Sequence, residues 1–204
     1  HYPLRRQRQM CIRDSLYGWF PFPADNPPRL WISPPLPLAA MQSTNTVTVT
    51  FDDWFLPASQ AIAIQQAPDF QQPKPIKILH HGFFALGCAQ ASLDLLQQQQ
   101  RDRPSPTLDQ AIAHFHRASQ KAEAALFDPL NAIDDLPITT ALTIRAQTIQ
   151  LCQQLSHAAI IATGGASNRL DHPAQRVYRE SLMFSISGQT DLIRDASLAQ
   201  FLSA

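Results

Sequence analysis

The C-terminal stretch of residues 162–190 combines glycine turns with helix starts and could therefore bind an anionic ligand. The chain has only six glycines, and three of them, Gly164, Gly165 and Gly188, lie in this stretch. Glycine tolerates a positive φ and lets a ligand or a second chain come close to the backbone. The free amides at the helix start beyond each turn attract anions. The stretch is therefore either a ligand loop or, equally, two turns that end one helix and begin the next.

Two further groups of side chains could take part in chemistry. His80 and His81 lie near the start of a predicted helix, and His81 is four residues from Lys77, so those two share a face. A histidine there could exchange protons with a ligand, or it could be an ordinary helix-start or interface residue. Arg176 and Glu180 are spaced i, i+4, which is typical of an ion pair that holds helices together.

Other common catalytic and metal-binding patterns are absent from the sequence. His114 and His116 are two residues apart and cannot share a helical face, so they predict no metal site. There is no Ser-His-Asp signature, phosphate-binding loop or zinc-ligand spacing. Of the three cysteines, Cys11 lies near the N-terminus, whereas Cys88 and Cys152 lie in apolar helical patterns. This usage indicates small core residues and a reducing compartment rather than a disulfide framework.

Apolar periodicity predicts the helices that would position these residues. Apolar side chains recur every three or four residues between 107 and 127, and Gly164 ends a long apolar segment that begins near residue 138. Pro173 suits the first turn of the next helix, and Gly188 separates that helix from a last one. We expect an antiparallel four- or five-helix bundle. Its predicted helices cover residues 75–100, 107–127, 138–163, 173–186 and the segment from Gly188 to 201.

The segment before the bundle predicts short strands and loops, because most of the seventeen prolines precede residue 76. Residues 19–23 are aromatic and interrupted by prolines, and residues 44–51 alternate between apolar and polar types, which predicts a half-buried strand. Residues 57–75 are rich in Gln and Pro and predict a connector. The predicted parts are a non-native or disordered leader (1–18), a β-region (19–66) and a helical domain (67–204).

The order of motifs along the chain resembles the acyl-CoA dehydrogenase superfamily. Gly164-Gly165 is followed by His172-Pro173, by QRVYRES at 175–181 and by the turn at Gly188, as in the C-terminal helical domain of that family. LGCAQASLD at 86–94 and STNTVTVTFDDWFLP at 43–57 are similar to its first C-terminal helix and to the end of its central β-barrel. The resemblance implies a C-terminal fragment: the last strands of a truncated barrel followed by the bundle. The GQT turn is typical of a monooxygenase-like or cyanobacterial-type branch.

The resemblance also implies a binding site for FAD, whose pyrophosphate needs helix-start amides, an arginine and glycine clearance. The arginine that follows the first long helix contacts the FAD phosphates in the family. The Gly-Gly loop reaches the FAD of a neighbouring subunit, and the second glycine turn lies at the flavin nucleotide. The residues at these positions, and hence the candidate cofactor-binding residues, are Arg103, Gly164, Gly165, Gly188, Gln189 and Thr190.

The catalytic carboxylate of the family has no counterpart at either of its known positions. Ser187 stands where most members have the glutamate base, and Lys77 stands at the alternative position near the start of the first helix. Ile78 stands where the family has a substrate-contacting arginine. Serine has no pKa near neutral pH and cannot replace the base unaided. The catalytic residue is therefore unknown from sequence, with His81 as the remaining candidate.

Three functions stay open at this point. The first is an FAD-dependent, acyl-CoA dehydrogenase-like oxidoreductase acting on CH–CH donors in fatty acid metabolism, whose substrate is an acyl-CoA or another small organic molecule. The second is a flavin-dependent monooxygenase of the same fold, and the third is a non-catalytic helical oligomerisation domain. We expect a homodimer or homotetramer in the cytoplasm. The formal net charge of zero predicts no nucleic-acid partner and no anionic membrane surface as a partner.

Overall fold

The computed structural model describes residues 14–18, 29–66 and 73–202 of the chain. These residues divide into two compact units, each described by itself. The first unit contains the strands and ends at Pro73. The second, called the helical unit below, contains residues 39–41 and the chain from Lys74 to its end.

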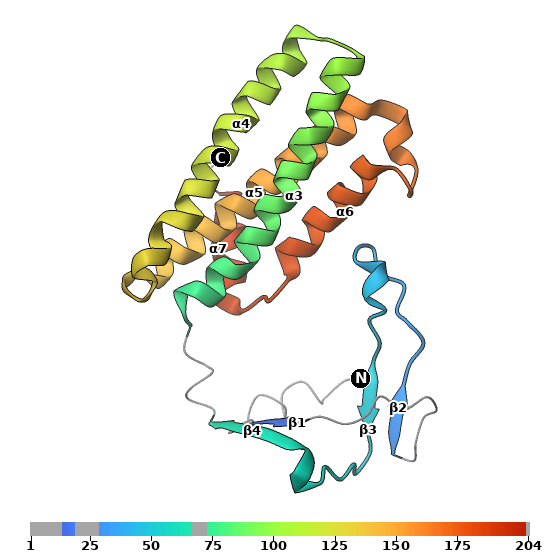
Figure 1. Ribbon diagram of the computed structural model, residues 1–204, viewed down its shortest axis with the longest axis vertical. Helices are drawn as coiled ribbons and strands as arrows, with labels where there is room; N and C mark the ends of the chain where they lie inside the picture. The colour runs from blue at the N-terminus through green and yellow to red at the C-terminus, as the bar shows by residue number, and fades with distance from the viewer. Residues whose placement is uncertain (1–13, 19–28, 67–72, 203–204) are drawn as a thin grey trace. The chain divides into compact units, whose positions relative to one another are not determined.

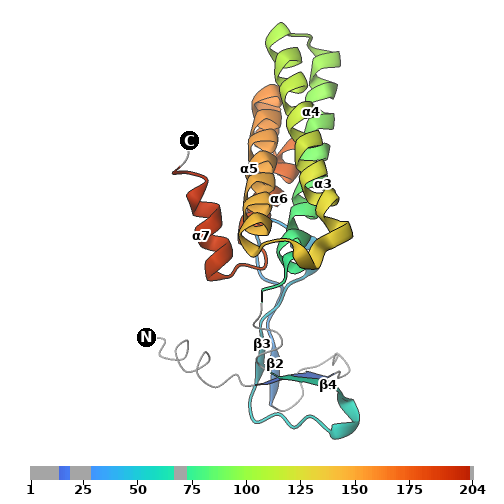
Figure 2. The same ribbon diagram turned by 90° about the vertical axis from the view of Figure 1, so that its left-hand side faces the viewer.

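Five α-helices of the described residues form the helical unit (Figure 1). Successive helices run in opposite directions, α3 and α5 pack against each other along the centre, and α4 and α6 each contact both of them. The short last helix lies against α5 (Figure 2). This bundle, with a few strands before it, confirms the predicted fold class. The helices are α3 (Pro75–Asp102), α4 (Pro106–Phe127), α5 (Ile138–Thr163), α6 (Pro173–Ile186) and α7 (Asp191–Ala199).

Local signals place the helix ends close to their predicted positions. The His172 side chain accepts a hydrogen bond from the Ala174 N–H at 3.1 Å and so caps the start of α6. Gly164, with a φ of 70°, ends α5 in a conformation that favours glycine. The start of α4 differs slightly from the prediction, because the helix begins at Pro106 rather than at residue 107 and Ser105 precedes its first turn.

The core of the bundle lies between α3 and α5, where small and large side chains alternate. Ala85 and Ala89 on α3 are fully buried, as are Leu155 and Ala159 on α5. Alanines at a contact let two helix axes approach closely, and the leucines then fill the remaining space. Cys152 is also fully buried in this cluster, which confirms its predicted place in the core.

The strands of the first unit form two separate antiparallel pairs. β1 (Asp14–Gly18) pairs with β4 (Ala61–Gln66), and β2 (Leu30–Ile32) pairs with β3 (Val49–Phe51). Residues 14–18, which the sequence assigned to the leader, thus belong to a sheet. The predicted strand at 19–23 lies outside the described residues.

Two sequence predictions in this unit are wrong. Only Val49–Phe51 of the predicted strand 44–51 is a strand, and its three residues are all exposed rather than half-buried. Asn45 has a φ of 48°, which is incompatible with an extended strand and interrupts the segment. The predicted connector at 57–75 contains β4, because the alternation in its AIAIQQ sequence pairs with β1.

Replacing Leu155 by alanine tests the packing between α3 and α5. We expect the Leu155→Ala variant to lose about 3 kcal/mol of unfolding free energy, because a fully buried leucine leaves a cavity between two rigid helices. Urea unfolding followed by circular dichroism measures this loss. Ile161→Ala on the same helix is the control, since Ile161 is 68% exposed and its truncation should cost far less. Equal losses for both variants would contradict the packing described.

Candidate functional site

The turn between α6 and α7 meets the start of α3 and brings Ser187 and His81 together. Ser187 follows the last residue of α6, and its Oγ lies 2.9 Å from Nδ1 of His81. Gly188 comes next, with a φ of 57°. A Cβ at this position would lie 2.6 Å from Nε2 of His81, so both the backbone conformation and the contact require glycine. The glycine turn of the sequence is therefore what lets the imidazole approach Ser187.

Arg145 of α5 lies beneath this turn and is almost completely buried, with 1% of its surface exposed. One terminal nitrogen donates to the carbonyl oxygen of Ser187 at 2.5 Å, and the other donates to the carbonyl oxygen of Ile78 at 3.2 Å. Its Nε is buried without a hydrogen-bond partner among the described residues. Burial lowers the pKa of Arg145, but guanidinium ionises so far above neutral pH that the side chain stays charged. Arg145 therefore ties α5 to the end of α6 and to the start of α3.

Backbone carbonyls, and no carboxylate among the described residues, accept the hydrogen bonds of Arg145. None of the ion pairs between described residues includes Arg145. The carbonyl of Ser187 belongs to the C-terminal end of α6, where unsatisfied carbonyls carry partial negative charge. A guanidinium at this place satisfies one such carbonyl and offsets part of the helix dipole.

His81 is held in its neutral form. Its pKa is lowered from the ordinary value by partial burial, then by the positive charge of Arg145 and by the neighbouring His80. Neutral imidazole carries a proton on only one ring nitrogen, so the Ser187 hydroxyl can either donate to Nδ1 or accept from it. The tautomer of His81 therefore decides whether the Ser187 proton is directed at the ring or is available to another group.

A groove of about 430 Å³ runs between α3 and α6, and the Ser187–His81 pair lies in its wall. Phe84, Met183 and Phe184 make much of the remaining wall apolar. Arg176 and Glu180 also line the groove, with 3.7 Å between the Arg176 Nε and a Glu180 carboxylate oxygen. The groove can therefore take an elongated apolar group with a polar end.

Comparison with solved structures identifies the fold that holds this groove. A probable acyl-CoA dehydrogenase from Mycobacterium abscessus superposes with a TM-score of 0.73 at 16% identity, over 85% of this chain and 50% of that one. An acyl-CoA dehydrogenase from Geobacillus kaustophilus gives 0.71 at 14% identity, over 85% and 49%. XiaF from Streptomyces sp., solved with FADH2 and glycerol, gives 0.61 at 18% identity, over 86% and 54%. No family model and no curated protein matches the sequence.

The chain has the fold of the C-terminal half of an acyl-CoA dehydrogenase. It spans about half the length of the solved structures that it matches. The strands that precede the bundle are part of this likeness. At these low sequence identities the likeness establishes the fold alone. The chemistry depends on the residues of the site.

Within this dehydrogenase fold, the predicted cofactor residues lie at two opposite ends of the bundle. Gly188 lies beside Arg145 at one end, whereas Gly164 is about 28 Å further along α5 at a rise of roughly 1.5 Å per residue. Arg103 follows the last residue of α3, which runs parallel to α5, so it lies at the same end as Gly164. Gly164 and Gly165 are exposed, and no atom lies within 4 Å of a Cβ built at either. The predicted cofactor residues of one chain therefore lie in two separate places.

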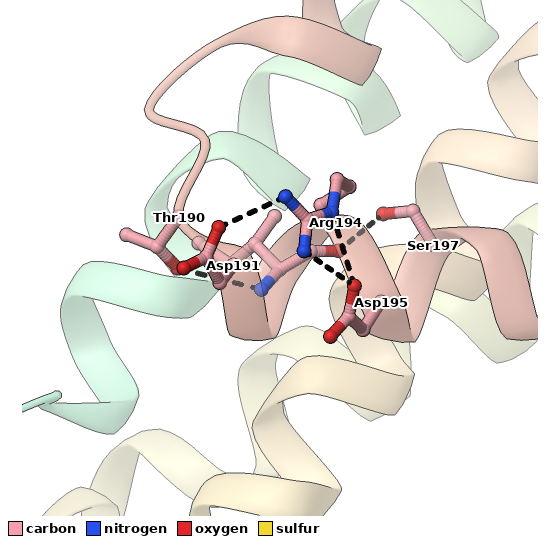
Figure 3. A network of polar contacts seen from close by, with 6 residues as sticks. Thr190, Asp191, Arg194, Asp195 and Ser197 are labelled. Carbon is pink, nitrogen blue, oxygen red and sulfur yellow. Dashed lines mark hydrogen bonds and ion pairs between the residues drawn. The ribbon is translucent and has the colours of Figure 1, made fainter. Parts of the chain in front are cut away.

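Thr190 and the residues after it form a polar network at the start of α7 (Figure 3). The Thr190 Oγ1 accepts from the N–H of Ile193 at 3.3 Å. Arg194 donates to Asp191 at 2.9 Å and to Asp195 at 3.0 Å. The hydroxyl of Thr190 thus acts as a helix cap, and its predicted role in binding FAD stays a prediction.

Gln189 faces a second cavity rather than the groove. This cavity, of about 260 Å³, lies between α5, α6 and α7, and Ile149, Leu198 and Phe201 also line it. The turn from Ser187 to Thr190 therefore separates two hollows, with Ser187 on one side and Gln189 on the other.

Sequence reasoning missed Arg145, and it treated Glu180 only as part of an ion pair. A signal for Arg145 was present, because it is the one Lys, Arg, Asp or Glu in the 26 residues of α5. A lone charge in an apolar helix is a group that must find buried partners. Glu180 lines the same groove as the Ser187–His81 pair, which only the packing of α6 on α3 reveals.

Substitution of Gly188 tests how tightly the turn holds His81. We expect Gly188→Ala to destabilise the chain by about 1–3 kcal/mol, because a non-glycine residue is strained at this φ and its Cβ would displace the imidazole. Thermal unfolding measures the loss. Gly87→Ala in α3 is the control, since a Cβ there meets nothing within 4 Å. The control should keep or raise the stability, and a Gly188→Ala variant as stable as the control would contradict the geometry.

The lowered pKa of His81 predicts a dependence of stability on pH. The unfolded chain binds a proton at His81 below about pH 6.5, whereas the folded chain resists it, so acidification below that pH should reduce the unfolding free energy. Urea unfolding at pH 7.5 and at pH values below 6.5 measures the difference. The His81→Gln variant should lose less stability on acidification than the unmodified chain. An identical pH dependence in both proteins would show that His81 ionises normally.

Proposed function

We propose that the chain is the C-terminal part of an FAD-dependent oxidoreductase of the acyl-CoA dehydrogenase type. The observation that carries the proposal is the fold likeness over about 85% of the chain to solved acyl-CoA dehydrogenases. Two other structures with the fold support a flavin and an acyl thioester as ligands. One is XiaF in complex with FADH2, and the other is a glutaryl-coenzyme A dehydrogenase in complex with glutaryl-CoA.

The described residues fit FAD at the end of the bundle that carries the Gly-Gly turn. Gly164 and Gly165 leave open space above an exposed backbone, and the exposed Arg103 lies at the same end and offers a cation for a pyrophosphate. Bound FAD would supply the acceptor for a hydride or for electrons. At the other end, Gly188, Gln189 and Thr190 would contact the cofactor through backbone and amide groups.

A second copy of the chain would bring the two ends together on one cofactor. Because Gly164 and Gly188 are separated along α5 by about 28 Å, we propose that the Gly-Gly turn of one protomer contacts the FAD of another. A homodimer or homotetramer is consistent with apolar side chains that remain exposed on the last three helices. These side chains are Ile161, Leu182, Ile186, Leu192 and Leu198.

The residue at the base position favours a flavin-dependent monooxygenase as a second candidate. Ser187 pairs with a neutral His81, and the one carboxylate among the described groove residues is Glu180. Glu180 precedes Ser187 by two turns of α6, about 10 Å, and is engaged with Arg176. Dehydrogenation needs a base for the substrate carbon acid, whereas oxygenation needs only groups that position and hydrogen-bond the reactants. The fold supports the broader proposal, an oxidoreductase of the acyl-CoA dehydrogenase type. The monooxygenase is the more specific alternative.

Flavin binding and reduction test the proposal. The protein expressed from its complete gene should be yellow or take up added FAD, which absorbance in the flavin region measures. Bleaching by an acyl-CoA without oxygen would identify a dehydrogenase, and bleaching only by a reduced nicotinamide or flavin source would identify an oxygenase. We expect the 204-residue chain alone to retain no FAD, because half of the matched fold is missing from it. A complete protein that stays colourless with excess FAD would overturn both functions and leave the helical oligomerisation domain.

A further inference from the structure

We propose that the end of the groove at Ser187 binds an anionic group of the ligand. The chemical class of ligand is an organic acid in its ionised form, such as a carboxylate or a phenolate, with an apolar body that lies along the groove. The site itself is defined by Ser187, His81 and Arg145. Its use in a reaction rests on the proposed flavoenzyme function, but its preference for an anion does not.

The charged side chains that α3 and α5 place near this end of the groove are positive. Asp191, Arg194 and Asp195 of α7 pair with one another beyond the turn, and none of them lines the groove. Arg145 is buried and has no carboxylate partner among the described residues. Its guanidinium donates to the carbonyl of Ser187, and Ser187 lines the groove. Lys77, one turn before His81 on α3, adds an exposed cation. On α6, Arg176 and Glu180 lie 3.7 Å apart and largely cancel each other. The excess positive charge lies at the Ser187 end.

Because Arg145 is buried, its positive charge acts strongly on a ligand at Ser187. Arg145 and Ser187 are shielded from water on the side of the bundle core, and charges interact more strongly there than in bulk solvent. The partial negative charge of the α6 C-terminus would repel an anion, but Arg145 already binds the Ser187 carbonyl and offsets it. A ligand anion at the Ser187 hydroxyl is therefore attracted by the guanidinium beneath it.

The hydrogen bond between Ser187 and His81 can orient the hydroxyl for an anion. When the Nδ1–H of neutral His81 donates to the Ser187 Oγ at 2.9 Å, the serine proton is free to donate to a ligand. The charge of Arg145 and the partial burial of the ring disfavour imidazolium, which keeps this neutral arrangement available at neutral pH. His80 on α3 adjoins the ring and also opposes its protonation. The site then offers a hydrogen-bond donor backed by positive charge.

The ionisation of bound 4-nitrophenol distinguishes this site from a merely apolar groove. The phenol and its phenolate absorb at different wavelengths, and the compound titrates near neutral pH. An apolar groove alone favours the neutral phenol and raises its pKa. The proposed site favours the phenolate, so we expect about tenfold tighter binding of the ionised form and a pKa lowered by about one. The two mechanisms thus predict shifts of opposite sign.

The experiment titrates 4-nitrophenol by absorbance with and without the 204-residue chain, and NMR chemical shifts of Ser187 and His81 locate the probe. Ser187→Ala removes the donor and should weaken phenolate binding several-fold. Ser187→Glu places a carboxylate at this position and should reverse the pKa shift. Arg176→Gln is the matched control, because it makes the net charge of the groove more negative by one, as Ser187→Glu does, but at a residue about three turns of α6 from Ser187, so the lowered pKa should persist. Both serine variants keep Arg145, so they do not remove the buried contact between helices.

Each outcome of this experiment decides the proposal. A raised phenol pKa, no binding, or shifts confined to residues away from Ser187 would overturn it. A lowered pKa that survives Ser187→Glu would also overturn it, because the charge would then lie elsewhere. Flavin absorbance is a separate measurement. A protein that lowers the phenol pKa but never binds FAD would support the anion site and overturn the flavoenzyme, and the converse result would do the opposite.

Discussion

The architecture of the candidate site depends on the buried guanidinium of Arg145. A charged side chain inside a helical bundle costs several kcal/mol unless hydrogen bonds compensate it. Here the compensating groups are two backbone carbonyls, one at the end of α6 and one near the start of α3. Moving either helix would remove one of these two hydrogen bonds from the buried charge. The cost of burying Arg145 therefore fixes the distance between the two segments that carry Ser187 and His81.

The turn that follows α6 satisfies several constraints at once. The carbonyl of Ser187 accepts a hydrogen bond from Arg145, and its hydroxyl is hydrogen-bonded to His81. The next residue, Gly188, must be glycine because a Cβ there would collide with the imidazole. The last residue of the turn, Thr190, caps α7. The four residues from Ser187 to Thr190 thus end one helix, begin another and form part of a groove wall. This division of roles makes the turn sensitive to substitution although much of it is exposed.

The chemistry of the chain is divided between the two ends of a long bundle. The exposed glycine pair and Arg103 lie toward one end, and the serine–histidine pair lies toward the other, because about three-quarters of the 26-residue helix α5 separates them. A ligand that contacts both ends must be extended or must lie between two copies of the chain. Ser187, which the sequence resemblance places at the position of the family's glutamate base, is hydrogen-bonded through its carbonyl to the buried Arg145.

The sequence by itself determined the helices of this protein. Pro173 and the glycine at 164 are local signals that act through φ and through missing hydrogen bonds, so α5 and α6 begin and end at the predicted residues. The strands were predicted less well, because a strand is stabilised by a distant partner, and β4 pairs with a segment more than forty residues earlier. Asn45, with its positive φ, also interrupts the beginning of an alternating pattern that looked uniform in sequence.

The tertiary structure decided which side chains form the site. Ser187 was visible in sequence as a missing base, and His81 as one histidine among seven, but 106 positions separate them. Arg145 was visible only as an isolated charge in an apolar helix. Helix formation depends on neighbours within one or two turns, and a sequence displays those directly. The meeting of Ser187, His81 and Arg145 depends instead on three helices packing in one register, and the requirement of a buried charge for hydrogen bonds selects that register.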